Sequence, residues 1–403
     1  MSITFPLVQS AWCLLLNVTT RPTTSVTTKL SWRLCVPTTE VPFLDLEASY
    51  RELADRAEPA MLQSFRSGRY ILGSDVERFE SAFAKYCDTA CAVGVANGLD
   101  ALRLALMAVG VGPGDKVMVP SHTYIATWLA VSACGATPVP VEPDPLTYNI
   151  TAEGMRAKME TGIKAVIPVH LYGQPADIEA IVATAAELEL KVIEDAAQAH
   201  GARWSERRIG GHGDAVCWSF YPGKNLGGLG DGGGVTTNSP EIADRIRVLR
   251  NYGSRVKYHH ETLGLNSRLD PVQAAFLSVK LEVLDEWNTR RTRIANRYLT
   301  ALQGTPIILP TVAEAASPVW HLFVIRCANR DQLANHLAAQ GISTLVHYPV
   351  PPHRQRAYAP LGWEPGSLPI AQELAREVLS LPIGPHLTEP QVSHVIDALL
   401  NSI

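Results

Sequence analysis

Residues 91–110 read CAVGVANGLDALRLALMAVG, a short apolar run followed by a segment with a different periodicity. Leu102, Leu106 and Val109 recur at intervals of three and four, which predicts an amphipathic helix soon after a strand at 91–95. The same alternation continues in KVMVP (116–120), a helix from about 123 to 134, KAVIPVH (164–170), the helix IEAIVATAAEL (178–188) and KVIED (191–195). Strands and helices that alternate at this spacing indicate right-handed crossovers. We therefore expect an α/β fold with a mainly parallel sheet sandwiched by helices.

The length of 403 residues predicts more than one domain. Residues 271–302 carry apolar side chains at steps of three and four, which is typical of one long amphipathic helix. Beyond this helix, short strands and helices alternate in WHLFVIR (320–326), DQLANHLAAQ (331–340) and ISTLVHYP (342–349). We predict a large domain at 41–290 and a smaller C-terminal α/β domain at 291–403. Residues 1–40 are expected to be a disordered arm, or the product of a start codon assigned too far upstream.

Composition narrows the class of protein. The net charge of −4 predicts no binding to nucleic acid, and the apolar segment AWCLLL (11–16) is too short to span a membrane. Seven cysteines form no CxxC pair and no HExxH motif occurs, which predicts reduced thiols and no metal site. These features favour a cytoplasmic enzyme that acts on small molecules.

Polar residues follow several of the predicted strands. In parallel sheets, ligands bind beyond the carboxyl ends of the strands. The residues expected at this edge are Asn97 and Gly98, His122 to Tyr124, His170, and Asp195 to Gln198. The strand DAVCWSF (214–220) leads to the same edge, and it is followed by PGKNLGGLGDGGG (222–234). Lys224 is therefore expected beside the other four segments.

A lone lysine in a loop is usually a solvated side chain. Here an acid, Asp195, ends a strand of the same sheet, Gly98 starts a helix whose amides could hold a phosphate, and Tyr124 could lie flat against a ring. These groups together meet the needs of pyridoxal phosphate (PLP). The lysine forms a Schiff base with the aldehyde, and the carboxylate keeps the pyridine nitrogen protonated.

Binding of a nicotinamide dinucleotide is the main alternative to PLP, because residues 228–233 match the motif GxGxxG. A dinucleotide fingerprint directly follows a strand and opens a helix. In this chain seven residues (221–227) intervene after the strand, and the following GVTTN looks extended. We interpret these glycines as a tight reversal of the chain that lets the backbone pass close to Lys224.

Several ordered motifs resemble those of the DegT/DnrJ/EryC1/StrS sugar aminotransferases from about Val41 to the C-terminus. They are GVANGLDALRLAL, VPSHTYIATWLAV, EDAAQAHGA, SFYPGKNLGGLGDGGGVTTN, GLNSRLDPVQAA and HYPVPPH. The resemblance implies the aspartate-aminotransferase fold (PLP-dependent transferase fold type I), PLP as cofactor, and a homodimer with active sites at its interface.

The resemblance also implies roles for individual residues. Lys224 would be the Schiff-base lysine, Asp195 the partner of the pyridine nitrogen, Gln198 a neighbour of the phenolic oxygen, and Tyr124 the stacking ring. Gly98 and Leu99 would bind the phosphate through their amides, Ser219 through its hydroxyl, and Asn266 from the other subunit. Many relatives have Gly-Thr or Gly-Ser where this chain has Gly98-Leu99, so one hydroxyl donor is missing here.

The expected reaction transfers an amino group from L-glutamate to a nucleotide-linked deoxysugar, with a dTDP-3-keto-6-deoxyhexose as the best candidate acceptor. A 4-keto sugar nucleotide, a non-catalytic regulator and an NAD-dependent oxidoreductase remain as alternatives. The basic and aromatic segment with Arg250, Arg255, Lys257, Tyr258, His259 and His260 is either a diphosphate site or a solvated helix end. Tyr348 and His353 are predicted to contact the sugar or its nucleotide, whereas His170 and His200 are predicted to be supporting or internally satisfied histidines.

Overall fold

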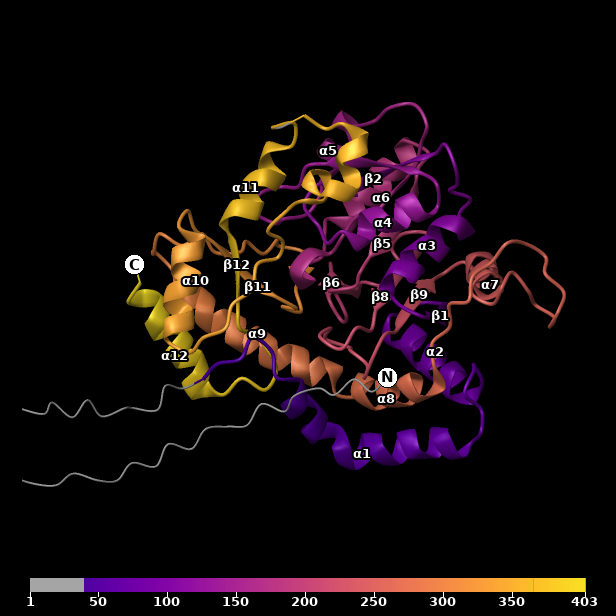
Figure 1. Ribbon diagram of the computed structural model, residues 1–403, viewed down its shortest axis with the longest axis horizontal. Coiled ribbons are helices and arrows are strands. Elements are labelled where there is room, and N and C mark those ends of the chain that lie inside the picture. The colour runs from indigo at the N-terminus through magenta and orange to yellow at the C-terminus, as the bar shows by residue number, and fades with distance from the viewer. Residues whose placement is uncertain (1–39, 365, 403) are drawn as a thin grey trace, which may run out of the picture. The chain divides into compact units, whose positions relative to one another are not determined.

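The computed structural model describes residues 40–364 and 366–402 (Figure 1). The described residues form one compact unit, and the description below concerns that unit alone. The predicted N-terminal arm, apart from its last residue, lies outside the described residues. In the described part of the chain, no helix is both long enough and apolar enough to cross a membrane.

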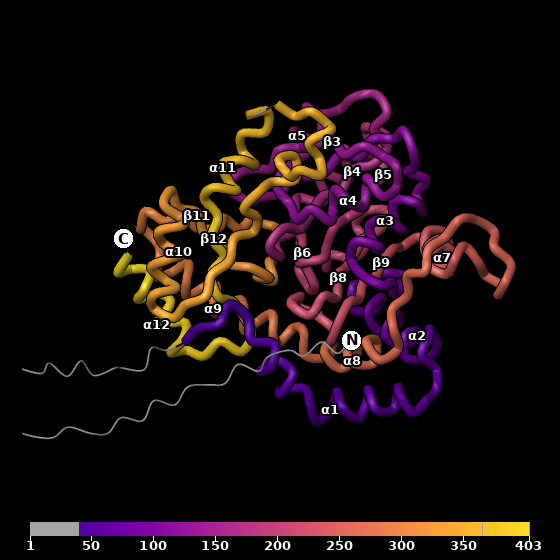
Figure 2. Tube along the Cα trace, viewed as in Figure 1, coloured from indigo at the N-terminus to yellow at the C-terminus, as the bar shows by residue number. Residues whose placement is uncertain are grey.

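A seven-stranded sheet forms the centre of the unit, in the strand order β1-β9-β8-β5-β4-β2-β3. Figure 2 traces the chain through this part of the unit and labels β3, β4, β5, β8 and β9. Its strands are β1 (Cys91–Val95), β2 (Lys116–Pro120), β3 (Thr137–Val141), β4 (Ile163–Val166), β5 (Lys191–Asp195), β8 (Ala215–Ser219) and β9 (Gly233–Thr237). Neighbouring strands are parallel, except that β9 runs antiparallel to both β1 and β8. The predicted mainly parallel sheet is confirmed.

Helices cover both faces of this sheet, as predicted, and each face has its own apolar core. One core includes α3 (Gly98–Ala108), α4 (Ala126–Ala133) and α7 (Pro240–Leu249). The opposite core includes α2 (Ser74–Tyr86), α5 (Ala152–Ala157), α6 (Ile178–Glu187) and α8 (Pro271–Leu281). Val192 and Ile193 of β5 belong to opposite cores because successive side chains of a strand point to opposite faces.

The remaining elements surround a third apolar core or extend the edges of the unit. The third core is built by α9 (Leu284–Ala301), α10 (Arg330–Ala339), α12 (Glu389–Leu400) and the antiparallel pair β11 (Phe323–Arg326) and β12 (Val378–Leu381). The other elements are α1 (Leu46–Arg66), α11 (Pro369–Glu377), and a small sheet of β6 (Arg203–Trp204), β7 (Arg207–Arg208) and β10 (Ala316–Ser317). The predicted domain boundary at 290 falls inside α9 and stays a prediction.

Two expectations about local structure are wrong. The single helix expected at 271–302 is two helices, because the amide of Val283 donates to the carbonyl of Lys280 in a tight turn between α8 and α9. The strand expected at 342–349 forms only isolated bridges, in which Ile342 pairs with Val41 and Leu345 with Ser380. The prolines at 349, 351 and 352 cannot donate to a strand ladder, which explains why no strand continues there.

Candidate active site

A cavity of about 540 Å³ lies where the carboxyl ends of β5 and β8 meet the start of α3. Its wall brings together eight of the residues that the sequence singled out, namely Gly98, Leu99, Tyr124, Asp195, Gln198, Ser219, Lys224 and Tyr348. These residues come from segments that are up to 250 positions apart in sequence, from Gly98 to Tyr348. The predicted clustering at this edge of the sheet is therefore observed in the structure.

Lys224 and Asp195 dominate the electrostatics of the cavity. Lys224 is half-buried in the loop after β8, and burial lowers the pKa of its amine to about 8, against an opposing effect of the Asp195 charge. Asp195 ends β5 and is 7% exposed. Burial raises the pKa of its carboxyl, although bonds from Thr127 Oγ1 at 2.9 Å and the Ala197 amide at 3.2 Å oppose this. The two groups share one cavity without pairing directly, since the described residues show no ion pair to Lys224.

The start of α3 forms a cradle for an anion beside Ser219. Asn97 caps the helix by accepting a hydrogen bond from the Asp100 amide at 2.8 Å, while the amides of Gly98 and Leu99 donate to no described residue. A Cβ on Gly98 would lie 2.7 Å from the Cβ of Ser219, so no larger residue fits there without a shift. Free amides and the positive end of the helix dipole favour a bound phosphate.

We expect Gly98→Ala to weaken binding of PLP. Forcing an extra methyl group into a packed site costs about 1–3 kcal/mol, which corresponds to a rise in Kd of about fivefold to 150-fold. Absorbance titration of the apo-protein with PLP measures this change. Gly112→Ala is the matched control because a Cβ there would meet nothing within 4 Å. Equal affinities for the two variants would contradict the cradle.

A second group of side chains forms the aromatic wall of the cavity. Gln198 accepts a hydrogen bond from the Tyr172 amide at 2.6 Å through Oε1 and donates to the Tyr348 hydroxyl at 3.0 Å through Nε2. The ring of Tyr124 lies 5.5 Å from that of Tyr348, and Tyr124 is 56% exposed. An exposed ring at the cavity wall is available to stack on a planar ligand.

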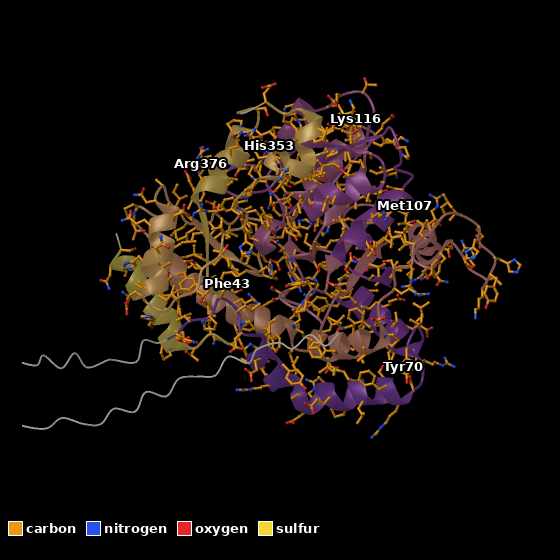
Figure 3. The ribbon with its side chains drawn as sticks, in the orientation of Figure 1. Phe43, Tyr70, Met107, Lys116, His353 and Arg376 are labelled. Atoms are coloured by element: carbon orange, nitrogen blue, oxygen red, sulfur yellow. The ribbon has the colours of Figure 1, made fainter. Side chains whose placement is uncertain are left out.

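Other predicted substrate residues do not line this cavity. Lys257, Tyr258 and His259 lie on an exposed loop that reaches out past α7 (Figure 1). His353 is buried in a short 3-10 turn, and Figure 3 shows it well apart from Phe43, which does line the cavity. Their assignment to substrate binding stays a prediction.

Asn266 is exposed at the base of the same loop, where it pairs with Asn251, and it does not line this cavity either.

Arg250 is neither a free cation for a diphosphate nor a solvated residue at a helix end, the two alternatives that the sequence left open. Its guanidinium is buried and pairs with Glu80 at 2.6 Å, and it also donates to the Gly94 carbonyl. Arg255 pairs with Asp244 and with Glu261. The local density of basic residues could not reveal Glu80 as a partner, because Glu80 is 170 positions away from Arg250.

The two histidines set aside as supporting groups differ from each other. His170 is satisfied, because Nε2 lies 2.9 Å from Glu194 and Nδ1 accepts from the Ala176 amide. Both ring nitrogens of His200 are buried with no partner among the described residues, and burial lowers its pKa to about 3. His200 is therefore neutral at physiological pH.

Sequence reasoning missed several residues of the cavity wall, including Asp231, Arg291, His321 and His347. His347 could have been found, since it is adjacent to Tyr348 in the motif HYPVPPH. The sequence did not single out Arg291, because it is one of several arginines on an amphipathic helix. An arginine in such a pattern is usually solvated.

The groups assembled in the cavity fit PLP. They supply an amine with a lowered pKa, a buried carboxylate, free amides at a helix start and an exposed aromatic ring. An oxidoreductase that binds a dinucleotide would need a helix opening at the 228–233 glycines, whereas the chain there enters the strand β9. That alternative is not supported.

Comparisons with known proteins agree with this geometry. The chain is 55% identical over 363 residues to the dTDP-3-amino-3,4,6-trideoxy-alpha-D-glucose transaminase of Streptomyces venezuelae, covering 90% of this chain and 96% of that protein. It is 53% identical over 361 residues to the erythromycin biosynthesis sensory transduction protein EryC1 of Saccharopolyspora erythraea, covering 89% and 99%.

A solved structure of S. venezuelae DesV in complex with a ketimine intermediate superposes with a TM-score of 0.89, covering 90% of this chain and 98% of that one at 55% identity. The profile of the DegT/DnrJ/EryC1/StrS aminotransferase family matches residues 52–400. The chain therefore belongs to the DegT/DnrJ/EryC1/StrS aminotransferase family, and its fold is that of the PLP-dependent aminotransferases.

Proposed function

We propose that this chain is a PLP-dependent aminotransferase that moves an amino group from L-glutamate to the 3-keto group of a dTDP-linked 6-deoxyhexose. One observation carries the proposal. A lysine with a lowered pKa and a buried carboxylate share one cavity, in a chain 55% identical to a dTDP-3-amino sugar transaminase. The sensory role in the name of EryC1 is less favoured here, because this chain retains Lys224 in that cavity.

Each residue of the cavity has a proposed role. Gly98 and Leu99 bind the phosphate through their amides, Ser219 adds its hydroxyl, and Tyr124 stacks on the ring. Asp195 holds the proton on the ring nitrogen. Because Asp195 is only 7% exposed, this contact is protected from water. Gln198 approaches the phenolic oxygen, while Tyr348 contacts the sugar.

When bound, PLP supplies an electron sink for a carbon that loses a proton. Lys224 does the proton transfers. Its Nζ accepts a proton from the α-carbon of the amino donor and, in the second half of the reaction, delivers one to the sugar carbon that gains the amine. A pKa of about 8 suits both tasks, because the amine then gives up and takes back a proton easily near neutral pH.

Spectroscopy of the purified protein with PLP tests this function. Addition of L-glutamate should remove the cofactor's visible absorbance, and subsequent addition of a keto sugar nucleotide should restore it. A panel of 3-keto and 4-keto sugars then identifies the acceptor. Preference for a 4-keto sugar would favour that alternative. Binding of PLP without any reaction with glutamate would favour a non-catalytic regulator.

A homodimer, with Asn266 of one chain completing the phosphate site of its neighbour, is part of the proposal. The support is that Asn266 is exposed yet lies outside the cavity of its own chain. The adjoining loop also carries Tyr258 and Leu263, which are 80% and 90% exposed. Exposed apolar residues of this size on one loop are typical of an interface. We also propose a cytoplasmic location, consistent with the five free cysteines of the described residues.

Mixing two inactive variants tests whether Asn266 acts across the interface. Lys224→Ala and Asn266→Ala, refolded together, form mixed dimers that contain one intact site if each site uses Lys224 of one chain and Asn266 of the other. Random pairing should therefore recover about a quarter of the wild-type activity. Recovery of no activity, with mixed dimers shown by mass spectrometry, would place Asn266 in the site of its own chain or outside the site altogether.

A further inference from the structure

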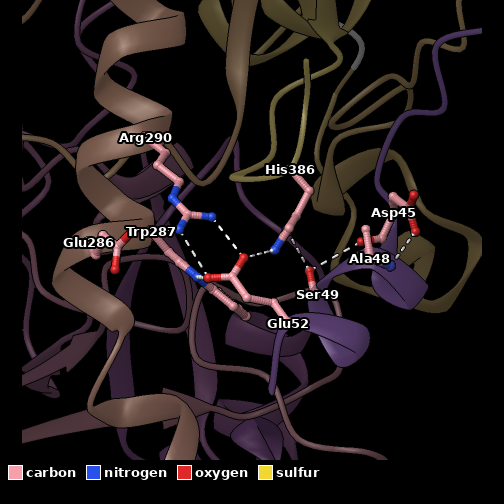
Figure 4. Close-up of polar contacts among 8 residues, drawn as sticks. All are labelled: Asp45, Ala48, Ser49, Glu52, Glu286, Trp287, Arg290 and His386. Atoms are coloured by element: carbon pink, nitrogen blue, oxygen red, sulfur yellow. Dashed lines mark hydrogen bonds and ion pairs between the residues drawn. The ribbon is translucent and has the colours of Figure 1, made fainter. Parts of the chain in front are cut away.

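Two adjacent arginines on α9 have opposite surroundings. Arg290 pairs with Glu52 at 2.8 Å and also with Glu286, as Figure 4 shows. This network fixes α9 against α1, and the hydrogen bonds from Arg290, Trp287 and His386 hold the pKa of Glu52 at about 2 even though burial raises it. Arg291 faces the other way, is 4% exposed, and forms part of the wall of the active-site cavity.

Among the described residues, no acid pairs with the charge of Arg291. Its Nη1 donates to the carbonyl oxygens of Trp320 at 3.2 Å, His321 at 3.4 Å and Ile383 at 3.1 Å. Within residues 40–364 and 366–402, no carboxylate lies within 4.0 Å of it. Burial lowers its pKa to about 10, so the group stays protonated at neutral pH. A buried cation without a counterion is costly, and such groups are normally paired.

One edge of this guanidinium remains available to a ligand. Nε and Nη2 donate no hydrogen bond to any described residue, since all three bonds of Arg291 come from Nη1. Adjacent N–H groups on one edge of a guanidinium match the two oxygens of a carboxylate. Because Arg291 belongs to the cavity wall, a carboxylate bound on that edge would lie in the cavity that contains Lys224.

No other side chain of the described cavity wall offers a permanent positive charge. Lys224 is the reacting amine, and burial holds the pKa of His347 at about 4. Burial, together with the charges of Lys224 and Arg291, holds the pKa of His321 well below its ordinary value. Both histidines are therefore neutral near pH 7, and Arg291 is the remaining cation.

We propose that Arg291 binds a carboxylate group of the amino-acid donor. This inference rests on the proposed aminotransferase function. In that function the amine of the donor lies beside Lys224, so the carboxylate of the donor lies in the same cavity. The sugar nucleotide carries no carboxylate. Its anionic diphosphate is joined to C1 of the sugar and is therefore separated from the keto carbon, which must lie beside Lys224. Arg291 thus makes the first half of the reaction specific for an anionic donor and contributes little to the second.

Arg291→Gln and Arg291→Lys test the assignment, with Arg290→Gln as the control of equal charge change. The affinity of the PLP-loaded protein for glutarate, a dicarboxylate without an amine, is measured by calorimetry. Loss of one partner of a buried charged pair should raise the Kd of glutarate by about 30-fold or more in Arg291→Gln. Arg291→Lys should recover part of this loss, and Arg290→Gln should change the Kd by less than about threefold, as its pairs are exposed.

The two half-reactions, followed separately by stopped-flow absorbance, give a second readout. Arg291→Gln should slow the reaction with glutamate by about 30-fold or more and leave the reaction of the aminated enzyme with the keto sugar nearly unchanged. If Arg291 only supports the three carbonyls, both half-reactions should slow together, the melting temperature should fall, and glutarate affinity should not change. That result would overturn the inference. Failure of wild-type protein to react with glutamate would instead overturn the proposed function.

Discussion

Lys224→Ala should abolish covalent capture of PLP and lower turnover by on the order of a thousandfold or more, because the variant lacks both the reacting amine and the group that moves protons. Reduction with borohydride in the presence of PLP, followed by mass spectrometry, should add one pyridoxyl group to wild type and none to the variant. Turnover is measured with glutamate and the best acceptor of the sugar panel. Labelling that persists in Lys224→Ala would refute the assignment.

Lys280 provides the sharpest control for this result. It is the second buried lysine near the cavity, its amine donates to the Gly227 carbonyl at 3.0 Å, and burial lowers its pKa to about 7. A lowered pKa alone would make it as reactive as Lys224. However, Lys280 does not line the large cavity, so Lys280→Met should keep the label. An exposed lysine without an ion pair, Lys158, supplies the ordinary control as Lys158→Ala.

Asp195→Asn should reduce turnover by on the order of 10²–10⁴-fold, since a preorganised charge that stabilises the reacting group is lost from a buried site. The amide keeps the size of the side chain. Thr127 can still donate to its oxygen, so the fold should be retained. Steady-state kinetics together with the melting temperature distinguish a loss of chemistry from a loss of folding. Turnover within a few-fold of wild type would contradict the proposed role.

The same substitution should change the pH dependence of PLP capture. Only the neutral amine attacks the aldehyde, so the rate of capture rises with pH and levels off above the pKa of Lys224, which is about 8. The charge of Asp195 raises that pKa. Its removal should therefore move the midpoint of the profile to lower pH. Asp231→Asn removes the other carboxylate of the cavity wall. Asp231 does not contribute to the shifted pKa of Lys224, so this variant should leave the midpoint unchanged.

Much of the site could be predicted because its parts are set by local sequence. Asn97-Gly98 begins a helix after β1, Asp195 ends β5, and Lys224 follows β8, so each position depends on a strand or helix boundary that periodicity reveals. The carboxyl ends of parallel strands then meet at one edge of the sheet. This rule brought the lysine, the acid and the anion cradle together without knowledge of the packing.

The residues that sequence reasoning missed or misread depend on contacts between distant segments. Arg250 caps the end of α7 and Arg291 lies in the middle of α9. Among the described residues, Arg250 is neutralised by Glu80, whereas Arg291 has only carbonyl partners. Tyr348 was predicted from its motif, but its hydrogen bond from Gln198, 150 positions earlier, was not. Nothing in the local pattern of charge or polarity encodes such pairings.

By itself the sequence determined the strands at 91–95, 116–120 and 191–195, the alternation that makes the sheet mainly parallel, and the order of the motifs around Lys224. These features follow from the period of apolar residues and from backbone preferences, which act over a few positions. Only the tertiary structure decided that β9 enters antiparallel between β1 and β8, that the helix expected at 271–302 breaks at Val283, and that Arg291 turns into the cavity while Arg290 turns away. Each of these outcomes is set by which remote surface an element packs against, and that information is absent from any short stretch of the chain.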